Sequence, residues 1–378
     1  MSKKRILIVG NANHSLITNY VKWLKKTRRD LEIDILTDRL IKNSARVYYN
    51  NVYYINFYNL LYSIIQRIPG IRALYASYLY SNIIKEVSKY EFVHIHFLSM
   101  HFSYFIFLVK KYTNTKVITT IWGSDFSHHY YKDKKLFKTA CSLSDKITFA
   151  NKKKREKFIE KFQWKKDNLL LCRFGLAPLE ILKEINITKE EAKKKLGWDH
   201  NKIAVTIGYN LNPLQQHLKI LQELNSLKEY HKDIELILPL TYGGNKAYKR
   251  KLLKTLNKLP FNYRIYDEYL SDYTVSLIRK ASQIMIQLQK TDQFSGSMQE
   301  HLYTRNVVIT GSWLPYQTMK DYGINFLEVE RIDQLSGTLI QVLKNYNNYH
   351  KDTSANPAAV LELSLWEKNI SNWAQLYE

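Results

Sequence analysis

Residues 287–311 read QLQKTDQFSGSMQEHLYTRNVVITG, and this stretch indicates the fold more clearly than any other. Asp292 and Glu300 lie eight positions apart, and small residues stand between them: Ser295, Gly296 and Ser297. Such residues favour a tight loop that begins a helix, and the first backbone N–H groups of a helix can bind a diphosphate. Glu300 is expected about one turn inside the helix, where its carboxylate can accept hydrogen bonds from a ribose diol. An ordinary capped surface helix begins in the same way.

Short apolar runs alternate with helical stretches on the N-terminal side of this segment and within it. The strand candidates of the first half are residues 5–9, 32–36, 92–97, 116–121 and 146–150. Those of the second half are residues 203–207, 234–238, 263–265, 284–288 and 307–309, with helices expected near 215–227, 246–257 and 271–281. Strands rich in Ile, Val and Leu that alternate with helices predict an α/β fold with parallel sheets covered on both faces.

The length of 378 residues suits two domains better than one. We expect an N-terminal Rossmann-like, acceptor-binding domain at residues 1–185 and a C-terminal Rossmann-like, nucleotide-sugar-binding domain at 186–365. The charged stretch 184–202 is the candidate linker, and residues 366–378 should form a helix that returns to the first domain. Two doubly wound units of this kind bind ligands between them, at the carboxyl ends of their strands.

The composition excludes several classes of protein. Apolar residues make up 45% of the chain, and Gly and Pro number only 12 and 7, so neither a collagen-like nor a disordered chain is expected. Cys141 and Cys172 form no CxxC pair, which argues against a disulfide framework or a zinc site. His94 and His96 share one face of a strand, but no third ligand stands at a suitable spacing, so no metal is assigned.

A formal net charge of +23 points to anionic partners. Residues 47–85 mix many tyrosines with aliphatic residues, and amphipathic rings suit a bilayer interface. Any one of these tyrosines could equally pack a helix against a sheet. Nucleic acid is disfavoured as a partner because basic residues are almost absent among these aromatics until Arg67 and Arg72. The pattern therefore predicts a protein that binds an anionic membrane surface.

No membrane-spanning segment is expected. The apolar run at residues 6–10 is too short for the core of a signal peptide. The longest nearly apolar run, 92–109, is interrupted by three histidines, whereas a spanning helix needs about 20 mostly apolar residues. We therefore expect a cytoplasmic protein that is peripheral at the inner face of the membrane.

Two loops of the second half carry further candidates for donor binding. Residues 208–219, GYNLNPLQQHLK, place Gly208 in a tight turn, Asn210 at a polar tip and His217 one turn into a helix, where a phosphate could bind. A single His in a helix is also a common packing residue. In residues 238–248, LPLTYGGNKAY, Tyr242 precedes two glycines and could lie against a base or sugar, or simply belong to a strand-to-helix turn.

The corresponding loop of the first half is TTIWGSDFSHHYY, residues 119–131. It follows a strand, so we expect Trp122, Gly123, Ser124 and Asp125 on the ligand-facing side. Asp125 is the candidate catalytic base, because a carboxylate in a closed site can have its pKa raised towards the operating pH. It could instead cap the next helix. Trp122, Gly123 and His96 are assigned to acceptor binding.

The order of these motifs resembles bacterial glycosyltransferases of the GT-B family. The likeness rests on TIWGSDF, ITFANKKKREKF, IGYNLNPLQQHLKIL, LPLTYGG and the turn at 294–300, and it covers roughly residues 90–320. Within that family the chain is most similar to the transferases that move 4-acetamido-4,6-dideoxygalactose (Fuc4NAc) from a dTDP donor onto a polyprenol-linked glycan. The tyrosine-rich segment resembles no family.

The resemblance implies a hexosyltransferase that needs no metal and no cofactor beyond its nucleotide-sugar donor, of UDP or dTDP type. It implies an acceptor hydroxyl, that of a glycan on a polyprenyl diphosphate used in surface-polysaccharide assembly. In the family's E-x7-E pattern the second carboxylate holds the nucleotide ribose and the first lies near the donor sugar; Glu300 and Asp292 match these positions. Residues 208–219 lack the family's Arg, so His217 and backbone donors take its place.

Two other functions remain open from the sequence. A nucleotide-sugar epimerase of the same two-domain fold would use a similar donor pocket without an acceptor. A non-catalytic polyanion-binding protein would use the positive charge alone, and its binding would depend strongly on salt.

Overall fold

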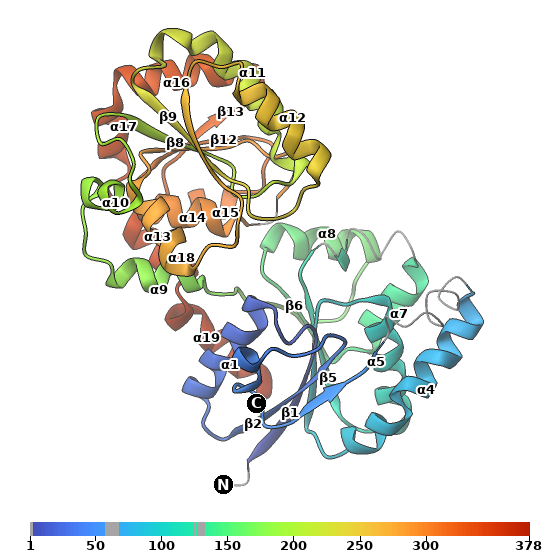
Figure 1. Cartoon of the computed structure of the whole chain (residues 1–378). Helices are drawn as coiled ribbons and strands as arrows, with labels where there is room; N and C mark the ends of the chain where they lie inside the picture. Colours follow the sequence, from blue (N-terminus) through green and yellow to red (C-terminus); the bar gives the residue numbers. More distant parts are fainter. Residues whose placement is uncertain (1–2, 57–67, 124, 127–132, 293) are drawn as a thin grey trace. The chain divides into compact units, whose positions relative to one another are not determined.

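The computed structural model describes residues 3–56, 68–123, 125–126, 133–292 and 294–378 (Figure 1). The chain folds into two compact units. Unit 1 comprises Met1–Gly175 and Trp366–Glu378, and unit 2 comprises Leu176–Leu365. The division after Gly175 lies ten residues before the boundary expected at residue 185. In the described part of the chain, no helix is long and apolar enough to cross a membrane.

Unit 1 contains a parallel sheet with the strand order β3-β2-β1-β4-β5-β6-β7. Alternate residues of β1 point to opposite faces of the sheet: Leu7 and Val9 belong to one apolar core, and Ile6 and Ile8 to another. Both faces are therefore buried, as parallel sheets require. The strands are β1 (Lys4–Val9), β2 (Leu31–Thr37), β3 (Val52–Tyr54), β4 (Phe92–His96), β5 (Lys116–Ile121), β6 (Lys146–Phe149) and β7 (Leu169–Leu171).

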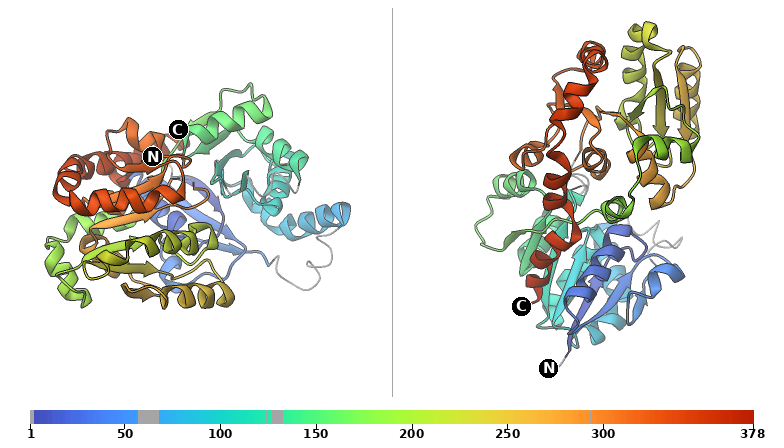
Figure 2. Two further views of the ribbon diagram at one scale, coloured as in Figure 1. Left: turned by 90° about the horizontal axis from the view of Figure 1, so that it is seen from above. Right: turned by 90° about the vertical axis from the view of Figure 1, so that its left-hand side faces the viewer.

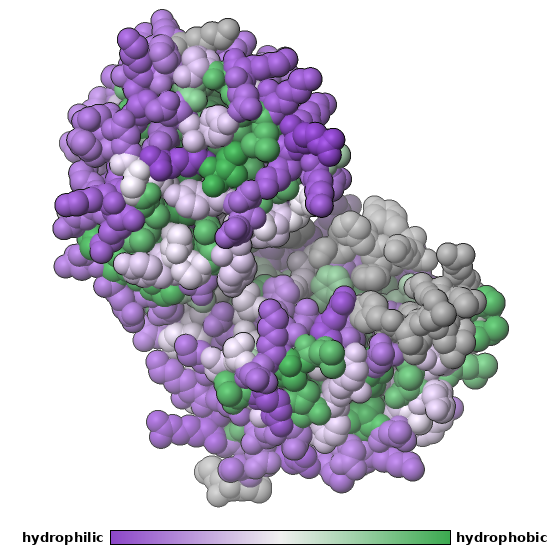
Figure 3. Space-filling model, in the orientation of Figure 1, coloured by the Kyte–Doolittle hydropathy of each residue, from purple (hydrophilic) through white to green (hydrophobic). Residues whose placement is uncertain are grey.

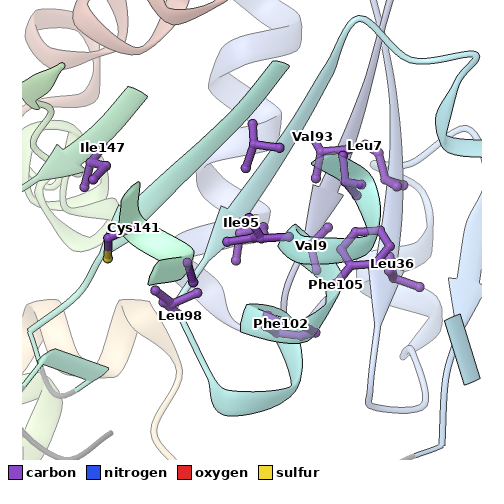
Figure 4. Close-up of a cluster of buried hydrophobic side chains, with 14 of the residues drawn as sticks. Leu7, Val9, Leu36, Val93, Ile95, Leu98, Phe102, Phe105, Cys141 and Ile147 are labelled. Atoms are coloured by element: carbon purple, nitrogen blue, oxygen red, sulfur yellow. The ribbon is translucent and has the colours of Figure 1, made fainter. Parts of the chain in front are cut away.

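Two layers of helices cover this sheet. Among the described residues, one layer includes α4 (Pro69–Val87), α5 (Met100–Tyr112), α7 (Lys134–Leu143) and α8 (Lys152–Phe162). Figure 4 shows side chains of the core beneath it, among them Leu7, Val93 and Phe105. The other layer includes α1 (Ser15–Thr27) and α19 (Trp366–Ala374), which lie side by side (Figures 1 and 2). The short helix α2 (Asn43–Arg46) follows β2.

Unit 2 repeats this architecture around a parallel sheet with the order β10-β9-β8-β11-β12-β13. Numbered from the first strand of the unit this order is 3-2-1-4-5-6, that of Rossmann folds. The strands are β8 (Ile203–Ile207), β9 (Ile234–Pro239), β10 (Asn262–Tyr266), β11 (Ile284–Gln287), β12 (Val307–Gly311) and β13 (Leu327–Val329).

The helices of unit 2 also form two layers. Val205 and Ile207 of β8 pack towards a core shared with α11 (His217–Leu224), α12 (Lys246–Leu256) and α16 (Leu335–Lys344). Met285 of β11 packs on the other face. The helices of that layer include α9 (Ala177–Glu184), α10 (Lys189–Leu196), α13 (Asp272–Ala281), α14 (Gly296–Tyr303) and α18 (Asn356–Ser364). Two further helices are α15 (Gln317–Asp321) and α17 (Tyr346–Asp352).

The stretch 184–202, expected to be a linker, belongs to unit 2. Thr188 and Glu191 form a reciprocal capping box that begins α10, so the charged residues here are helical. The Lys189 ammonium donates to Ser282 O at 2.7 Å and to Thr304 O at 3.2 Å, just beyond the ends of α13 and α14. Burial lowers the pKa of Lys189 to about 7. The segment therefore holds two helices of the unit in place.

The strand pattern of the sequence is confirmed in most places, and the exceptions are edge strands. β5 and β8 have the predicted bounds, and the other predicted strands differ by one or two residues at their ends. β3, β7 and β13, three residues each, lie at sheet edges and were missed, because such short strands have no periodic apolar pattern.

The C-terminal segment is anchored inside unit 1 by polar contacts. Tyr377 is fully buried, and its hydroxyl lies 2.5 Å from His94 Nδ1 and within hydrogen-bond reach of the Tyr20 hydroxyl. His94 Nε2 lies 2.7 Å from Thr120 Oγ1. The chain end thereby connects α1, β4 and β5.

Replacing Tyr377 by Phe should therefore destabilise the protein. The change removes one hydroxyl and leaves buried groups of His94 and Tyr20 without that partner, a loss of about 1–3 kcal/mol in the free energy of unfolding. Urea unfolding of the full chain measures it. Tyr269→Phe is the control, because Tyr269 is 92% exposed and its change should stay within about 0.5 kcal/mol. Equal effects of the two changes would show that the buried contacts contribute nothing.

Candidate functional site

In each sheet the order in which the chain adds strands reverses at one point, and the polar candidate residues gather at that point. In unit 2 the chain runs outward from β8 in one direction and from β11 in the other, so the loops after these adjacent strands leave the same edge. The loops are joined by hydrogen bonds from Gln216 Nε2 to Leu288 O and from Lys290 N to Leu214 O, at 2.7 and 2.8 Å. Such a switch point is where open α/β sheets bind ligands.

Gly208 begins the loop after β8 in a conformation that favours glycine. Its φ is +61°, and a Cβ at this position would lie 2.8 Å from Gln215 Oε1 and 3.2 Å from His217 Nε2. The backbone of Gly208 is thus packed against two polar side chains. The sequence identified Gly208 and His217, and the structure brings them together.

His217 is the first residue of α11 and is completely buried. Its Nδ1 lies 3.2 Å from the Tyr248 hydroxyl, whereas its Nε2 has no hydrogen-bond partner among the described residues. Burial lowers the pKa of His217 to about 4, so the ring is neutral at physiological pH. A neutral imidazole with one unused nitrogen can accept or donate a single hydrogen bond to a ligand.

Two glutamines at the end of β11 extend this cluster, and the sequence reasoning missed both. Gln289 Oε1 accepts from Gln215 Nε2 at 2.7 Å, and Gln289 Nε2 is buried without a partner in the described chain. Gln287 is fully buried, and its Oε1 is likewise unpartnered. Polar residues at the end of a strand predicted to be buried and just beyond it were the signal that could have found them.

The loop after β11 leads into α14, as the sequence predicted. Ser295 caps the helix, and its Oγ accepts from the Met298 N–H at 3.1 Å. The N–H groups of Gly296 and Ser297, the first two helical residues, have no acceptor within the helix. The Ser297 hydroxyl is buried and has no partner among the described residues. The start of α14 therefore offers backbone and side-chain donors for an anion.

Glu300 lies in the second turn of α14 and is 6% exposed. Its Oε2 accepts from Arg279 Nε of α13 at 3.0 Å, and Arg279 is also 6% exposed. Oε1 lies on the Gly296 side, 3.9 Å from the position that a Cβ on Gly296 would take. Arg279 was not foreseen, because it is 21 residues away in the sequence. The ion pair holds the carboxylate in one orientation and leaves one oxygen directed to the start of the helix.

Asp292 lies in the same loop and is held by a side chain from beyond β12. The Tyr316 hydroxyl donates to Asp292 Oδ2, and Tyr316 is 1% exposed. Burial and this carboxylate raise the pKa of the Tyr316 hydroxyl well above its usual value. The pair fixes the loop that separates β11 from α14.

Asn210 and Tyr242, also predicted to bind donor, occupy neighbouring loops with different surroundings. Asn210 is 6% exposed, and its Oδ1 accepts from the Asn212 N–H at 2.9 Å, so it shapes the turn. The carbonyl of Tyr242 accepts from the Leu211 N–H at 2.7 Å, which joins the loops after β8 and β9. The Tyr242 side chain is 61% exposed.

Unit 1 has a pocket of about 440 Å³ at the carboxyl ends of β1, β2, β4 and β5, which is its own switch point. Its lining is polar and aromatic, and includes Asn11, His14, Arg39, His96, His101 and Trp122. His14 caps α1, with its Nδ1 accepting from the Leu16 N–H at 3.2 Å, and its ring meets Trp122 edge to face at 4.6 Å. The sequence predicted His96 and Trp122 here but not His14 or Arg39.

His96 is fully buried in the wall of this pocket, stacked on His94 at 4.2 Å between ring centroids. Neither of its ring nitrogens has a hydrogen-bond partner among the described residues, and the same holds for the Trp122 indole nitrogen. Burial and the nearby His14 lower the pKa of His96 to about 3, so it is neutral at physiological pH. The pocket thus offers one unused indole donor and one unused imidazole.

Asp125, the expected catalytic base, lies on the predicted loop after β5, but its carboxylate is enclosed by backbone N–H groups. It is fully buried, and its two oxygens accept four backbone N–H groups, at 2.7–3.1 Å: those of Leu98, Trp122, Gly123 and Phe126. Burial raises its pKa, and these hydrogen bonds oppose that change. These four hydrogen bonds occupy both carboxylate oxygens and argue against Asp125 as the base that takes a proton from a substrate. Asp125 instead holds the loop after β5, where Gly123 has a φ of +105°, against the loop after β4.

Ser124, also predicted on this loop, lies outside the described residues, as does part of the tyrosine-rich segment, 57–67. In the described ranges no group of three or more His, Cys, Asp or Glu side chains could hold a metal ion.

Several solved structures similar to this one are of glycosyltransferases. A glycosyltransferase from Rickettsia africae is 15% identical with a TM-score of 0.73, and the match covers 100% of this chain and 98% of that one. HepE (Alr3699) from Anabaena, in complex with UDP-glucose, is 11% identical with a TM-score of 0.71. The match covers 98% of this chain and 99% of HepE. The chain has the GT-B fold. A UDP-forming trehalose-phosphate synthase from Burkholderia xenovorans shares that fold, with 13% identity, a TM-score of 0.70 and coverage of 100% and 98%.

No protein-family model matches the chain, and no curated protein matches it. The GT-B fold is thus recognised through its two parallel sheets, while the specific likeness to Fuc4NAc transferases has no counterpart in these comparisons.

If Asp125 organises its loop, Asp125→Asn should unfold more easily. The amide nitrogen would face backbone N–H donors that the carboxylate now satisfies, at a loss of about 2–4 kcal/mol in the free energy of unfolding. Chemical denaturation measures this. The control is Asp333→Asn, whose exposed carboxylate pairs with Arg331 and should contribute less than about 0.5 kcal/mol. A stable Asp125→Asn protein that has lost only activity would restore Asp125 as the base.

The neutral, buried His96 makes stability depend on pH. Its pKa is about 3 when folded and roughly 6.5 when unfolded, so the unfolded chain binds the extra proton as the pH falls through this window. Stability is fully present above the unfolded value and is lost towards pH 3, by an amount on the order of 4 kcal/mol. His96→Gln should lose less stability than the wild type between pH 7 and acid, in denaturation curves at several pH values.

The matched control is His200→Gln, because His200 is exposed. It should reproduce the wild-type pH profile of the unfolding free energy. If the unfolding free energy of His96→Gln fell with pH as steeply as that of the wild type, the pKa of His96 would not be lowered in the folded state.

Proposed function

We propose that this protein is a glycosyltransferase that moves a sugar from a nucleotide-sugar donor to an acceptor hydroxyl. The observation that carries the proposal is a set of buried polar atoms at one edge of unit 2 that lack partners in the described structure: His217 Nε2, Gln287 Oε1, Gln289 Nε2 and Ser297 Oγ. An unpartnered buried polar group costs about 1–3 kcal/mol, so such atoms seldom gather without a ligand to meet them.

The donor diphosphate would lie at the start of α14. There the N–H groups of Gly296 and Ser297, the Ser297 hydroxyl and the His217 ring can each donate one hydrogen bond to an oxygen. These donors would stabilise the negative charge that the departing nucleoside diphosphate acquires. Glu300, oriented by Arg279, would accept hydrogen bonds from the ribose diol, and Asp292 would lie near the donor sugar.

The acceptor would bind in the pocket of unit 1. Neutral His96 can accept a hydrogen bond from an acceptor hydroxyl, and the Trp122 indole can donate one to a ring or substituent oxygen. The Nδ1 of His14 already accepts a backbone hydrogen bond, so its proton resides on Nε2 and it serves as a donor. The pocket therefore suits a polar, uncharged or anionic sugar end, which its Arg39 side chain could also contact.

The finer assignment follows the sequence resemblance. We propose a donor with a UDP or dTDP moiety, and as acceptor a glycan on a polyprenyl diphosphate at the cytoplasmic face of a membrane, in surface-polysaccharide assembly as for Fuc4NAc transferases. The positive charge of the chain supports a lipid-bound anionic acceptor. HepE, which shares the fold, is described in complex with UDP-glucose and with UDP.

Isothermal titration with UDP, dTDP and GDP tests the donor site. We expect one nucleotide to bind, and Ser297→Ala to weaken its affinity severalfold while the free protein is no less stable, because the lost hydroxyl has no partner in the described structure. Glu300→Gln keeps an acceptor for Arg279 and should weaken binding about tenfold. Glu300→Ala is less informative, because it would leave the buried Arg279 unpaired.

The matched control for Glu300→Gln is Glu235→Gln. Glu235 is 4% exposed and pairs with Arg264 at 2.7 Å, but it lies near the amino end of β9, away from the switch point. It should leave nucleotide affinity unchanged. Binding of no nucleotide would overturn the proposal, and salt-dependent nucleic-acid binding in its place would favour the polyanion-binding alternative. Conversion of a nucleotide sugar without an acceptor would instead identify an epimerase.

A further inference from the structure

Helix α4 of unit 1 is apolar on two opposite sides. Ala76, Tyr80, Ile83 and Val87 are buried in the core beneath the helix. Another set of apolar side chains points to solvent: Ile71 is 46% exposed, Leu74 73% and Tyr78 73%. At 100° per residue, the exposed set and the buried set are centred about 180° apart around the helix. We call the set Ile71, Leu74 and Tyr78 the outer stripe of α4.

An apolar stripe of this kind is unusual for a helix on a water-facing surface. Surface helices bury one apolar face and present charged or polar residues on the other, and a helix that is apolar all round is covered on all sides. Over residues 71–78 the outer face of α4 therefore has the pattern of a covered face, although it is exposed; further along, the same side carries exposed polar residues, Ser81, Asn82 and Lys85. Figure 3 shows hydrophobic surface at the right-hand edge of the molecule, where Figure 1 draws α4.

The charge of the protein is concentrated in the same unit. Unit 1 contains 33 Lys and Arg against 14 Asp and Glu, a net charge of +19, whereas unit 2 contains 24 against 20, a net charge of +4. The two units have nearly the same size, so this is a difference in surface chemistry. An anionic partner would meet unit 1 first.

Within unit 1, the charge is enriched in the helix layer that contains α4. The helices α4, α5, α7 and α8 carry thirteen basic residues and three acidic ones. α4 packs on α5 and α5 on α7, while Phe137 of α7 stacks on Phe162 of α8 at 6.0 Å, so the four helices form one continuous layer. Its exposed basic side chains include Lys85, Lys111, Lys135, Lys138, Lys152, Lys153 and Lys157.

We infer that this layer is a membrane-docking surface: the outer stripe of α4 enters the interface of an anionic bilayer, and the lysines of α7 and α8 contact its headgroups. Two contributions hold a peripheral protein on such a surface: the burial of apolar side chains in the interface and the attraction of neighbouring basic side chains to anionic headgroups. The Tyr78 ring, apolar in its body and polar at its tip, suits the headgroup boundary. The inference deepens the proposed function, because it names the surface that brings unit 1 to a lipid-linked acceptor.

Two other occupants fit the layer less well. A second copy of the chain docked face to face would place the same basic helices opposite each other, and like charges would oppose that contact. Nucleic acid would complement the charge, but Ile71 and Leu74 offer neither hydrogen bonds nor stacking to it. A bilayer with anionic lipids satisfies both the apolar and the basic residues.

Co-flotation of the full chain with lipid vesicles tests the inference. We expect binding to vesicles of phosphatidylcholine mixed with phosphatidylglycerol, and much weaker binding to phosphatidylcholine alone. Leu74→Ser combined with Tyr78→Ser should reduce the partition coefficient by at least about tenfold, because it removes the two most exposed apolar side chains of the stripe. Lys135→Gln with Lys138→Gln should weaken binding mainly at low salt, because screening already reduces that contribution at high salt.

Leu40→Ser is the matched control, because Leu40 of unit 1 is 78% exposed but lies outside α4. It should bind vesicles like the wild type. Unchanged melting temperature and nucleotide affinity would show that the α4 variant is folded, and they separate this test from that of the donor site. Vesicle binding by Leu74→Ser/Tyr78→Ser equal to that of the wild type would overturn the inference, as would self-association through α4 or duplex binding without vesicle binding.

Discussion

A parallel sheet that is buried on both faces places its ligand-binding polar groups at the carboxyl ends of the strands, and this constraint determines where both sites of the molecule lie. Most strand side chains of both units are apolar, and several buried hydrogen-bonding groups without partners in the described structure lie at the last strand positions or in the loops that follow, among them His96, Gln287 and Gln289. In each unit these groups gather where the strand order reverses, beside β8 and β11 and beside β1 and β4. Position in the fold, more than any single motif, therefore selects the residues that can bind a ligand.

Much of the fold could be read from the sequence because long, buried strands leave a clear pattern. β5 and β8 were predicted to the residue, whereas β3, β7 and β13 were missed, since three residues at a sheet edge show no periodic pattern. The linker expected at 184–202 was an error of a different kind. Its charges looked like those of a solvated connection, but Thr188 and Glu191 cap a helix, and such local hydrogen bonds outweigh charge density.

The site was predictable to the extent that it is local in sequence. Ser295, Gly296, Ser297 and Glu300 follow one another through a loop and a helix, so their grouping was visible. Arg279 and Tyr316 come from other elements, and their contacts depend on tertiary packing. Asp125 shows most clearly what the sequence does not reveal. A buried aspartate that binds a substrate and one that accepts hydrogen bonds from its own backbone cannot be told apart by residue type.

The division of unit 1 into two separate pieces of chain has a consequence for how the protein is made. Unit 2 is continuous, from Leu176 to Leu365, and is complete before residue 366 has been synthesised. The sheet of unit 1 is made first but waits for Trp366, Trp373 and Tyr377 to cover its α1 face. Until these residues are made, the apolar surface that they cover is exposed. The unit whose synthesis begins first is therefore the last to complete its folding.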